Sequence, residues 1–495
     1  MLNQPPALSL REMAMLKIAV AVCNDPEVRH LVKEYGSSAF AFPCRETHLF
    51  LSKEPASYEG KAHALRIDEC RAEALMRTCA SVDLIVHIEP KDEYTGEPLI
   101  DLLPSQKWEK LVVSKLFSIL ESPLLQKELF TLVRLISYEI DKWFKDHNDI
   151  IHCNSEIQYS FQWKSQGKID REETAKILIT NETLRVSERY GLACYYYLEE
   201  EAFYLWNRMT NAEKKRFYEG AIFIPFWFVN KWERQERTVP WSYFAWVYVH
   251  NPLGLRNIFP KLKGSQKLEF LRSILFRRSI DYEDMLFCLS EIDVSEHEDV
   301  FKACSAQVLE CLLNWPLQSE FINVSNHLLP YITEKDFRDL LESIIYSRIM
   351  VGFKDYDYVR LLQEFWAVSP SHFKESVKED GIYKPLMFAV NYDLEQPFPS
   401  EQFFDYYEEE DLNFVFCGVK YCLFKRENSF PSGMDWKHGT LAELYKGCKR
   451  IQDATTLLHL SVVASDDAQL SFSIPDAQLS QMVDASNFAV DAELQ

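Results

Sequence analysis

Apolar residues recur at helical spacing along most of the chain, and the N-terminal segment shows this pattern most clearly. Ser9 and Glu12 have the spacing of a capping box, and the nearly all-apolar run after them predicts a buried helix that ends near Cys23. Asp25, followed by a proline, provides the cap of a second helix that we expect to stop at Gly36. Together the two segments predict a short helical hairpin.

Longer helical patterns follow. Residues 105–121 and 123–145 each carry an extended apolar stripe, and from residue 169 onward the chain reads as one helix after another. The clearest stripe comprises Phe337, Leu340, Leu341, Ile344 and Ile345. Thr333 lies just before this stripe and is a plausible helix cap.

One segment departs from helical spacing. Ile157, Tyr159, Phe161 and Trp163 alternate with polar residues, a period of two that predicts a half-buried β-strand. A single strand is not stable alone, so we expect this one to pair with the apolar run at 84–88 or to lie across helices.

These patterns predict an all-α fold with at most a minor strand element. We expect an N-terminal, mainly helical domain over residues 1–165, with a boundary near Gly167. Residues 168–460 are predicted to form an irregular, α-solenoid-like array of helical hairpins. Residues 461–495 are poor in basic and aromatic side chains and are predicted to be a flexible acidic tail.

A faint internal repeat supports the array. Phe270–Ile274 resembles Leu340–Ile344, and a second pair of segments just downstream recurs at a similar interval, 70 to 76 residues in all. Such an interval fits two helical-hairpin units. The match follows no known repeat consensus residue by residue.

Aromatic side chains concentrate between Tyr195 and Tyr248. This segment holds 18 of them in 54 positions, against 14% for the whole chain. Aromatic residues dominate both cores and interfaces. We interpret residues 195–248 as the thickest part of the core of the array, with a partly exposed binding groove as the alternative.

Sequence motifs for catalysis or cofactor binding are absent. The 14 glycines never lie closer than six residues, which excludes a dinucleotide fingerprint and a Walker A loop. No Cys-x-x-Cys or His-Glu-x-x-His spacing occurs, and Glu-x-x-His occurs once, at Glu27 and His30, whereas a di-metal bundle needs it on two helices. His147 and His152 lie among acids, but five residues apart they do not share a helical face, so a polar helix end is expected. We therefore expect no catalytic, cofactor-binding or metal-binding residues.

The net charge of −21 disfavours general nucleic-acid binding and favours basic partners. One segment is locally basic and comprises Arg256, Lys261, Lys263, Lys267, Arg272, Arg277 and Arg278. We interpret it either as the solvated face of a helix with its preceding loop or as a docking patch for an acidic partner.

The expected compartment follows from what the N-terminus and the cysteines lack. No secretory signal is visible, and the 12 cysteines show no paired spacing, so we interpret them as reduced. The most apolar run, residues 220–229, is too short to span a membrane. We expect a cytoplasmic protein, with the nucleus as the alternative compartment.

These features favour a non-catalytic protein–protein interaction scaffold built on stacked helices. This prediction rests on analogy at the level of the fold. The alternative is a hydrolase-like enzyme whose dispersed site leaves no motif in the sequence. A deep pocket lined by two or more titratable groups with shifted pKa values would favour the enzyme.

Overall fold

The computed structural model describes residues 8–52, 103–148, 150–151, 155–218, 252–276, 280–407, 412–416 and 419–422. All of them belong to one of the two compact units of the chain, which spans residues 1–94 and 101–445. This unit contains described residues from both sides of the predicted boundary near Gly167. The run at 84–88, the aromatic residues from 219 to 248 and the predicted tail lie outside the described residues.

The N-terminal hairpin is formed as predicted by helices α1 (Leu10–Cys23) and α2 (Pro26–Tyr35). The Glu12 carboxylate accepts the backbone N–H of Ser9 at 2.7 Å, and the Ser9 hydroxyl oxygen accepts the N–H of Glu12 at 3.2 Å. The Asp25 side chain accepts two N–H groups at the start of α2. Both helices therefore begin where local capping satisfies their first free amides.

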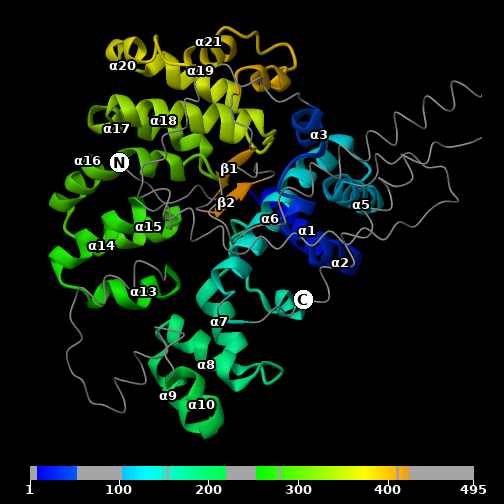
Figure 1. The fold of residues 1–495 in the computed structure, drawn as a ribbon, viewed down its shortest axis with the longest axis vertical. Helices are drawn as coiled ribbons and strands as arrows, with labels where there is room; N and C mark the ends of the chain where they lie inside the picture. Colours follow the sequence, from blue (N-terminus) through cyan, green and yellow to red (C-terminus); the bar gives the residue numbers. More distant parts are fainter. Residues whose placement is uncertain are drawn as a thin grey trace, which may run out of the picture. The chain divides into compact units, whose positions relative to one another are not determined.

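Helix α6 (Pro123–Asp146) lies at the centre of the N-terminal helices and packs against α1 and α5 (Pro104–Ile119). Both α5 and α6 begin with proline, which suits the first helical position because its missing N–H has no partner there. Helix α3 (Cys44–Ser52) contacts α5 and completes this group, drawn in blue and cyan in Figure 1. The two predicted long helices are confirmed.

The predicted strand at 157–163 is wrong. Residues Ser155–Ser160 form a 3₁₀ helix, η3, and Trp163 makes only an isolated antiparallel bridge to Ile169. Ile157 and Phe161 are both buried, and because they are four residues apart they satisfy helical spacing as well as a period of two. The positions of Ile157 and Phe161 therefore do not distinguish a strand from a helix.

Gly167 fixes the turn of this bridge against the N-terminal helices. Its φ is +74°, and an added Cβ would lie 2.8 Å from a methyl group of Leu16 in α1 and 3.1 Å from one of Ile136 in α6. Only glycine allows both the backbone angle and the close approach. The segment that follows is thus anchored on α1 and α6.

Helices continue from residue 171 through the rest of the described chain. They are α7 (Arg171–Thr180), α8 (Val186–Tyr195), α9 (Glu199–Arg208), α10 (Asn211–Tyr218), α13 (Leu255–Ile258), α14 (Gly264–Phe276), α15 (Tyr282–Ser290), α16 (Val294–Cys311), α17 (Phe321–Leu328), α18 (Glu334–Ile344), α19 (Tyr358–Val368), α20 (Ser371–Ser376) and α21 (Tyr383–Val390). Shorter turns are the 3₁₀ helices η1 (Gly36–Ala39), η4 (Pro252–Gly254), η5 (Phe259–Lys261), η6 (Gln318–Glu320), η7 (Leu329–Tyr331) and η9 (Ser400–Asp405), and the π-helix η8 (Ile345–Met350).

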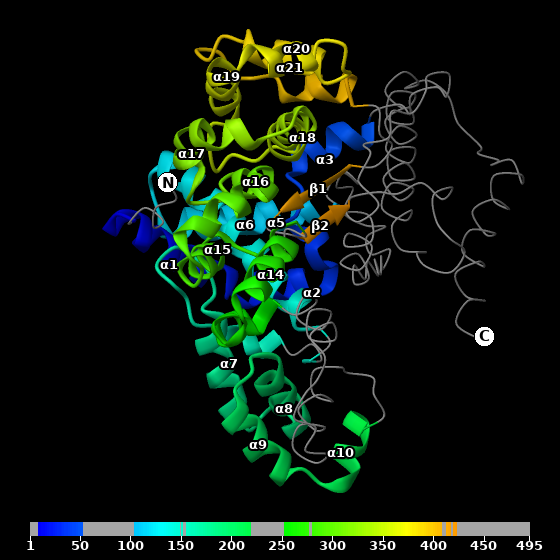
Figure 2. The same ribbon diagram turned by 90° about the vertical axis from the view of Figure 1, so that its left-hand side faces the viewer.

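Neighbouring helices in this region contact one another in succession: α14 with α16, α16 with α18, α17 with α19, and α19 with α21. Figures 1 and 2 show α13 to α21 as consecutive layers.

The Thr333 cap is confirmed, since its hydroxyl accepts the N–H of Asp336 at 3.1 Å. The apolar stripe of α18 is buried, including Phe337 and Ile344. In the described part of the aromatic segment, Tyr196 and Trp206 are buried, whereas Tyr204 is 58% exposed.

A two-stranded antiparallel hairpin is the one sheet in the described residues. Strands β1 (Asn413–Phe416) and β2 (Val419–Cys422) pair with Phe414 opposite Tyr421. Their rings pack on α6, because Tyr138 lies 4.6 Å from Phe416 and 5.1 Å from Tyr421 between ring centroids. The fold is therefore all-α with this small addition, which lies at residues 413–422 and not at the predicted 157–163.

None of the described helices combines the length and apolarity needed to cross a membrane.

Candidate functional site

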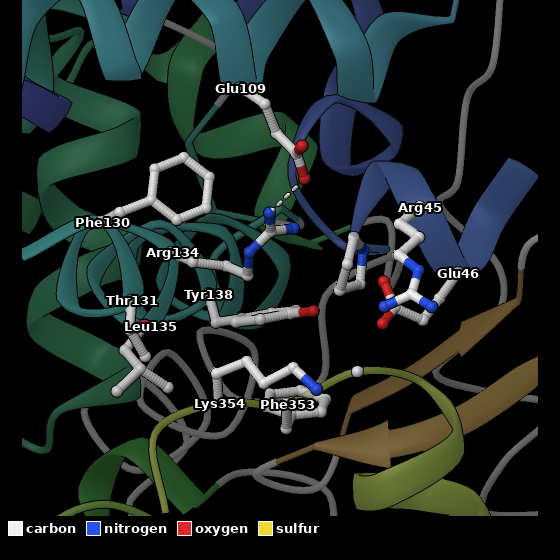
Figure 3. Close-up of a pocket in the computed structure, with 12 residues that line it drawn as sticks. Arg45, Glu46, Glu109, Phe130, Thr131, Arg134, Leu135, Tyr138, Phe353 and Lys354 are labelled. Carbon is white, nitrogen blue, oxygen red and sulfur yellow. Dashed lines mark hydrogen bonds and ion pairs between the residues drawn. The ribbon is translucent and has the colours of Figure 1, made fainter. Parts of the chain in front are cut away.

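A cavity of about 230 Å³ opens beside α6, between α3, α5 and the loop after η8 (Figure 3). Its charged lining residues are Arg45, Glu46, Glu109, Arg134 and Lys354. We call it the α6 cavity. It brings together side chains from segments that are far apart in the sequence.

The floor and walls of the α6 cavity are largely apolar. Phe130, Leu135 and Tyr138 come from successive turns of α6, and Phe353 faces them from the loop. The Tyr138 and Phe353 rings stack with centroids 5.8 Å apart. The buried Tyr138 hydroxyl donates to the Ala41 carbonyl, and burial raises the pKa of Tyr138 above its ordinary range. Tyr138 is therefore a neutral, fixed wall of the cavity.

Arg134 and Glu109 form a fixed ion pair on one side of the cavity. Nη2 of Arg134 lies 2.7 Å from the Glu109 carboxylate, and Nη1 donates to the Phe40 carbonyl at 2.6 Å. The same Glu109 oxygen accepts the backbone N–H of Cys44 at 2.8 Å. Because each group has partners within the protein, we interpret this pair as structural.

Glu46 lies where α3 meets the loop after η8. The residue is 4% exposed and lines the α6 cavity. It lies against Gly352, where an added Cβ would come within 2.5 Å of the Glu46 carboxyl carbon. Gly352 also has a φ of +81°. Both this backbone angle and the close contact with Glu46 therefore require glycine at this position.

Two further side chains complete the surroundings of the α6 cavity. Lys354 is exposed and, among the described residues, has no carboxylate within ion-pair distance. Arg45 pairs with Glu401 at 3.1 Å on the surface. Cys44 lies nearby, but burial and the Glu109 charge raise the pKa of its thiol to about 11. A thiol with so high a pKa is a poor nucleophile at neutral pH.

A second cluster of charges joins α6 to the segment after Gly167. The buried Glu139 carboxylate accepts hydrogen bonds from Lys168 Nζ at 3.0 Å and from the Ile169 N–H at 3.1 Å. Asp146 pairs with Arg171 at 2.7 Å. Burial opposes ionisation of both carboxyls, but the neighbouring cations outweigh it and hold the pKa values of Glu139 and Asp146 below their ordinary range.

The cluster extends to the first turn of α15. Asp281 caps this helix by accepting the N–H of Asp284 at 2.9 Å, and Arg256 Nε lies 2.7 Å from the Asp284 carboxylate. Lys164 pairs with Glu283 at 2.6 Å. Burial and the Asp281 charge together raise the pKa of Asp284 above its ordinary value. The Lys164–Glu283 pair connects the turn around Gly167 to α15, and the Arg256–Asp284 pair connects α13 to it.

A small cavity of about 60 Å³ lies within this cluster. Glu139, Arg171 and Asp281 all line it, and all have shifted pKa values. The shifts stabilise the charged form of each group, whereas a general acid or base needs a pKa near the working pH. The cavity has room for only a few waters. We interpret it as part of a structural charge network.

The described part of the locally basic segment is spread over α13, η5 and α14. Arg256 pairs with Asp284 at 2.7 Å, Lys261 with Glu199 at 3.5 Å and Lys267 with Glu291 at 3.5 Å. Lys263 is exposed, and Arg272 is half-buried with its Nε lacking a hydrogen-bond partner. Arg277 and Arg278 lie outside the described residues. The structure thus pairs three of the five described cations with carboxylates of the same chain.

His147, at the end of α6, is an interior side chain. Its ring stacks on Trp143 with centroids 3.9 Å apart, and Nε2 lies 2.8 Å from the Tyr196 hydroxyl. His152 lies outside the described residues. Across the described ranges, no group of three or more His, Cys, Asp or Glu side chains is arranged to hold a metal ion.

Sequence reasoning did not find the α6 cavity. Glu46 lies in an ordinary amphipathic helix and Lys354 in a loop, so neither carries a local signal of a site. Gly352 is the one signal that was available, because an isolated glycine between apolar residues often marks a close approach of backbone and side chain.

No protein-family model matches the chain, and neither a curated protein nor a solved structure shows significant similarity to it.

Proposed function

We propose that the protein is a non-catalytic scaffold that binds other proteins through the surfaces of its helices. The observation that carries this proposal is a group of exposed apolar side chains where α5 ends and α6 begins. Phe117 is 63% exposed, Ile119 48% and Leu124 67%. Large apolar side chains exposed together mark protein interaction surfaces.

The start of α1 adds to this surface. Leu10 is 83% exposed, and the ion pair between Arg11 and Glu128 ties the first turn of α1 to the second turn of α6. Leu10 therefore lies at the same end of these helices as Leu124. We call Leu10, Phe117, Ile119 and Leu124 the α5–α6 apolar surface.

The net charge of the chain indicates which class of protein it would bind. The net charge of −21 favours a basic protein as the partner. In this proposal the layers α13 to α21 act as an irregular helical-hairpin array, and such arrays present elongated surfaces to other macromolecules. The protein would act in the cytoplasm or the nucleus.

The test is affinity capture with the full chain at low and high salt, with partners identified by mass spectrometry. The variant Phe117→Asp/Leu124→Asp places charge in the apolar surface, and Val294→Asp is its control, because Val294 is 81% exposed on α16. We expect a partner that wild type and Val294→Asp retain and the double variant loses. A partner retained equally by all three, or no enrichment above background, would refute the proposal.

The locally basic segment is a second docking surface within the same proposal, for an acidic partner. Arg256, Lys261 and Lys263 are its exposed members in the described residues, and Arg256 is held by Asp284. Lys261→Glu/Lys263→Glu should release such a partner and leave binding at the α5–α6 apolar surface unchanged. If the exchange releases nothing, the segment is only a solvated face.

A further inference from the structure

The loop side of the α6 cavity is built from an unusual stretch of backbone. Helix α18 passes directly into the π-helix η8, and the chain then turns at Gly352 with a φ of +81°. The Phe353 N–H donates to the Arg348 carbonyl at 3.0 Å and closes this turn. π-Helical turns are rare and occur frequently at functional sites, so the backbone itself marks the α6 cavity as a candidate binding site.

Three aromatic rings line the α6 cavity, and each is packed against a neighbouring ring. The Phe353 ring stacks on Phe416 of β1 with centroids 5.3 Å apart and on Tyr138 at 5.8 Å. The Phe130 ring packs against Trp108, with 5.7 Å between centroids. Figure 3 shows Phe130, Tyr138 and Phe353 around the same space. Rings that are already held in place lose little side-chain freedom when a ligand binds against them.

The charged side chains around the α6 cavity add up to no net charge. They are the lining cations Arg45, Arg134 and Lys354, the lining carboxylates Glu46 and Glu109, and Glu401, which pairs with Arg45. With as many cations as carboxylates among the described residues, the surroundings favour neither a cationic nor an anionic ligand. A neutral ligand also avoids the cost of taking a charge out of water.

The volume of the α6 cavity sets the size of the ligand. An apolar cavity of about 150 Å³ accepts benzene, with six non-hydrogen atoms. At about 230 Å³ the α6 cavity has room, in proportion, for a ligand of about nine non-hydrogen atoms. Against walls made of aromatic rings, an aromatic ligand gains a ring–ring attraction that raises its affinity about twofold to tenfold over an aliphatic ligand of equal size.

We infer that the α6 cavity binds a small, neutral aromatic molecule of about nine non-hydrogen atoms. Its ring would lie against Phe130, Tyr138 and Phe353. A single polar group of the ligand would point to the mouth of the cavity, where Arg45 and Lys354 are exposed. This inference is independent of the scaffold proposal, since it needs no protein partner and does not use the α5–α6 apolar surface.

The experiment is a calorimetric titration of the full chain with four ligands that each have nine non-hydrogen atoms. Acetophenone is neutral and aromatic, and benzoate has a charged oxygen in place of its methyl group. The other two are 2-phenylethylammonium, an aromatic cation, and cyclooctanone, a neutral aliphatic ketone. We expect acetophenone to bind tightest, the two charged ligands at least about tenfold more weakly, and cyclooctanone about twofold to tenfold more weakly.

One variant tests the space of the α6 cavity. Thr131 lines the cavity from α6, so Thr131→Phe fills part of it and should weaken acetophenone at least about tenfold. Lys127→Phe is the matched control, because Lys127 is exposed one turn earlier on α6 and does not line the cavity. The control should bind acetophenone as tightly as wild type.

A second variant tests the aromatic wall. Phe130→Leu should weaken acetophenone about twofold to tenfold and leave the affinity for cyclooctanone unchanged, because only the aromatic ligand loses a ring contact. Phe144→Leu is its control: Phe144 is a half-buried ring of the same helix that does not line the cavity, and its loss should leave both affinities unchanged.

Each other outcome overturns the inference. Neither heat nor NMR saturation transfer with acetophenone at millimolar concentration shows that the cavity takes no such ligand. Benzoate or 2-phenylethylammonium binding as tightly as acetophenone shows a site for ions, and cyclooctanone binding as tightly shows an apolar space without aromatic preference. Undiminished binding by folded Thr131→Phe, checked by circular dichroism, places the ligand elsewhere. Should Thr131→Phe fail to fold, Phe130→Leu decides, and an unchanged acetophenone affinity refutes the inference.

Discussion

Arg134 of α6 and Glu109 of α5 form an ion pair, with Nη2 of the guanidinium 2.7 Å from the carboxylate. The Arg134 side chain is 10% exposed and that of Glu109 26%. Because the carboxylate also accepts the first backbone N–H of α3, a single acidic side chain holds three helices together. The pair thereby fixes one side of the α6 cavity.

Glu109→Leu should lower the free energy of unfolding by about 2–4 kcal/mol. It leaves the Arg134 guanidinium and the Cys44 N–H without their acceptor, and the partial exposure of Glu109 keeps the loss near the lower end for buried pairs. Urea unfolding measures the change. The double variant Glu109→Leu/Arg134→Leu should recover much of the loss, because no uncompensated charge remains.

The control for this cycle is Glu128→Leu, which breaks the surface pair with Arg11 and should cost less than about 1 kcal/mol. If the double variant is as unstable as the sum of the two single variants, the interaction between Arg134 and Glu109 is not what stabilises this region.

Tyr138→Phe should destabilise the protein by about 1–2 kcal/mol. The change removes the hydroxyl that donates to the Ala41 carbonyl and leaves that acceptor buried, while the ring contacts stay. Tyr138→Ala should cost about 3–5 kcal/mol, since it also empties the space between Phe40, Phe353 and the β1–β2 hairpin. Thermal or urea unfolding separates the two. Tyr204→Phe, at an exposed tyrosine, should leave stability unchanged.

Helix starts could be predicted from the sequence because capping is local. Ser9, Asp25 and Thr333 each accept an N–H within three residues, so a window of four residues contains the whole interaction. The β1–β2 hairpin was missed for the opposite reason. Its rings pack on Tyr138, about 280 positions away, and nothing within the strands reveals that partner.

The α6 cavity is beyond sequence reasoning for a similar reason. Glu46 is an ordinary helical glutamate until the loop at Gly352 covers it, and that loop lies about 300 positions further along the chain. The burial of Glu46 is a property of the folded molecule alone. The absence of glycine-rich and paired-cysteine motifs restricted the class of function, but it gave no position for a site.

Asp355 should make stability fall as the pH rises. Its Oδ2 accepts from Gln318 at 2.7 Å, but its Oδ1 is buried without a hydrogen-bond partner. Burial raises the pKa of Asp355 to about 6, although the Arg348 charge opposes the rise. The folded state therefore holds the proton more tightly than the unfolded state. This contribution is full below about pH 4 and is lost as the pH rises through about 6.

Asp355→Asn removes the titration and should raise the free energy of unfolding at pH 7.5 by about 1–3 kcal/mol, with no gain at pH 4. Urea unfolding at the two pH values measures this difference. Asp405→Asn, at an exposed aspartate, is the surface control. An equal gain at both pH values would show that the effect is not ionisation.

His147 should give the opposite pH dependence. Nδ1 lies 2.6 Å from the Trp143 carbonyl, so it carries the proton, and Nε2 accepts from the Tyr196 hydroxyl. Burial, aided by the Arg171 charge, lowers the pKa of His147 to about 3. As the pH falls below about 6.5 the unfolded state takes up a proton that the folded state refuses, so stability is lost progressively down to about pH 3.

His147→Phe keeps a ring against Trp143 but cannot titrate. We expect lower stability than wild type at pH 7.5, because the Tyr196 hydroxyl loses its acceptor, and a shallower loss between pH 6.5 and 4.5. Urea unfolding at four pH values across this range gives the slopes. Tyr196→Phe retains the imidazole and should retain the wild-type slope. If the slopes of His147→Phe and wild type coincide, His147 is not held neutral in the folded protein.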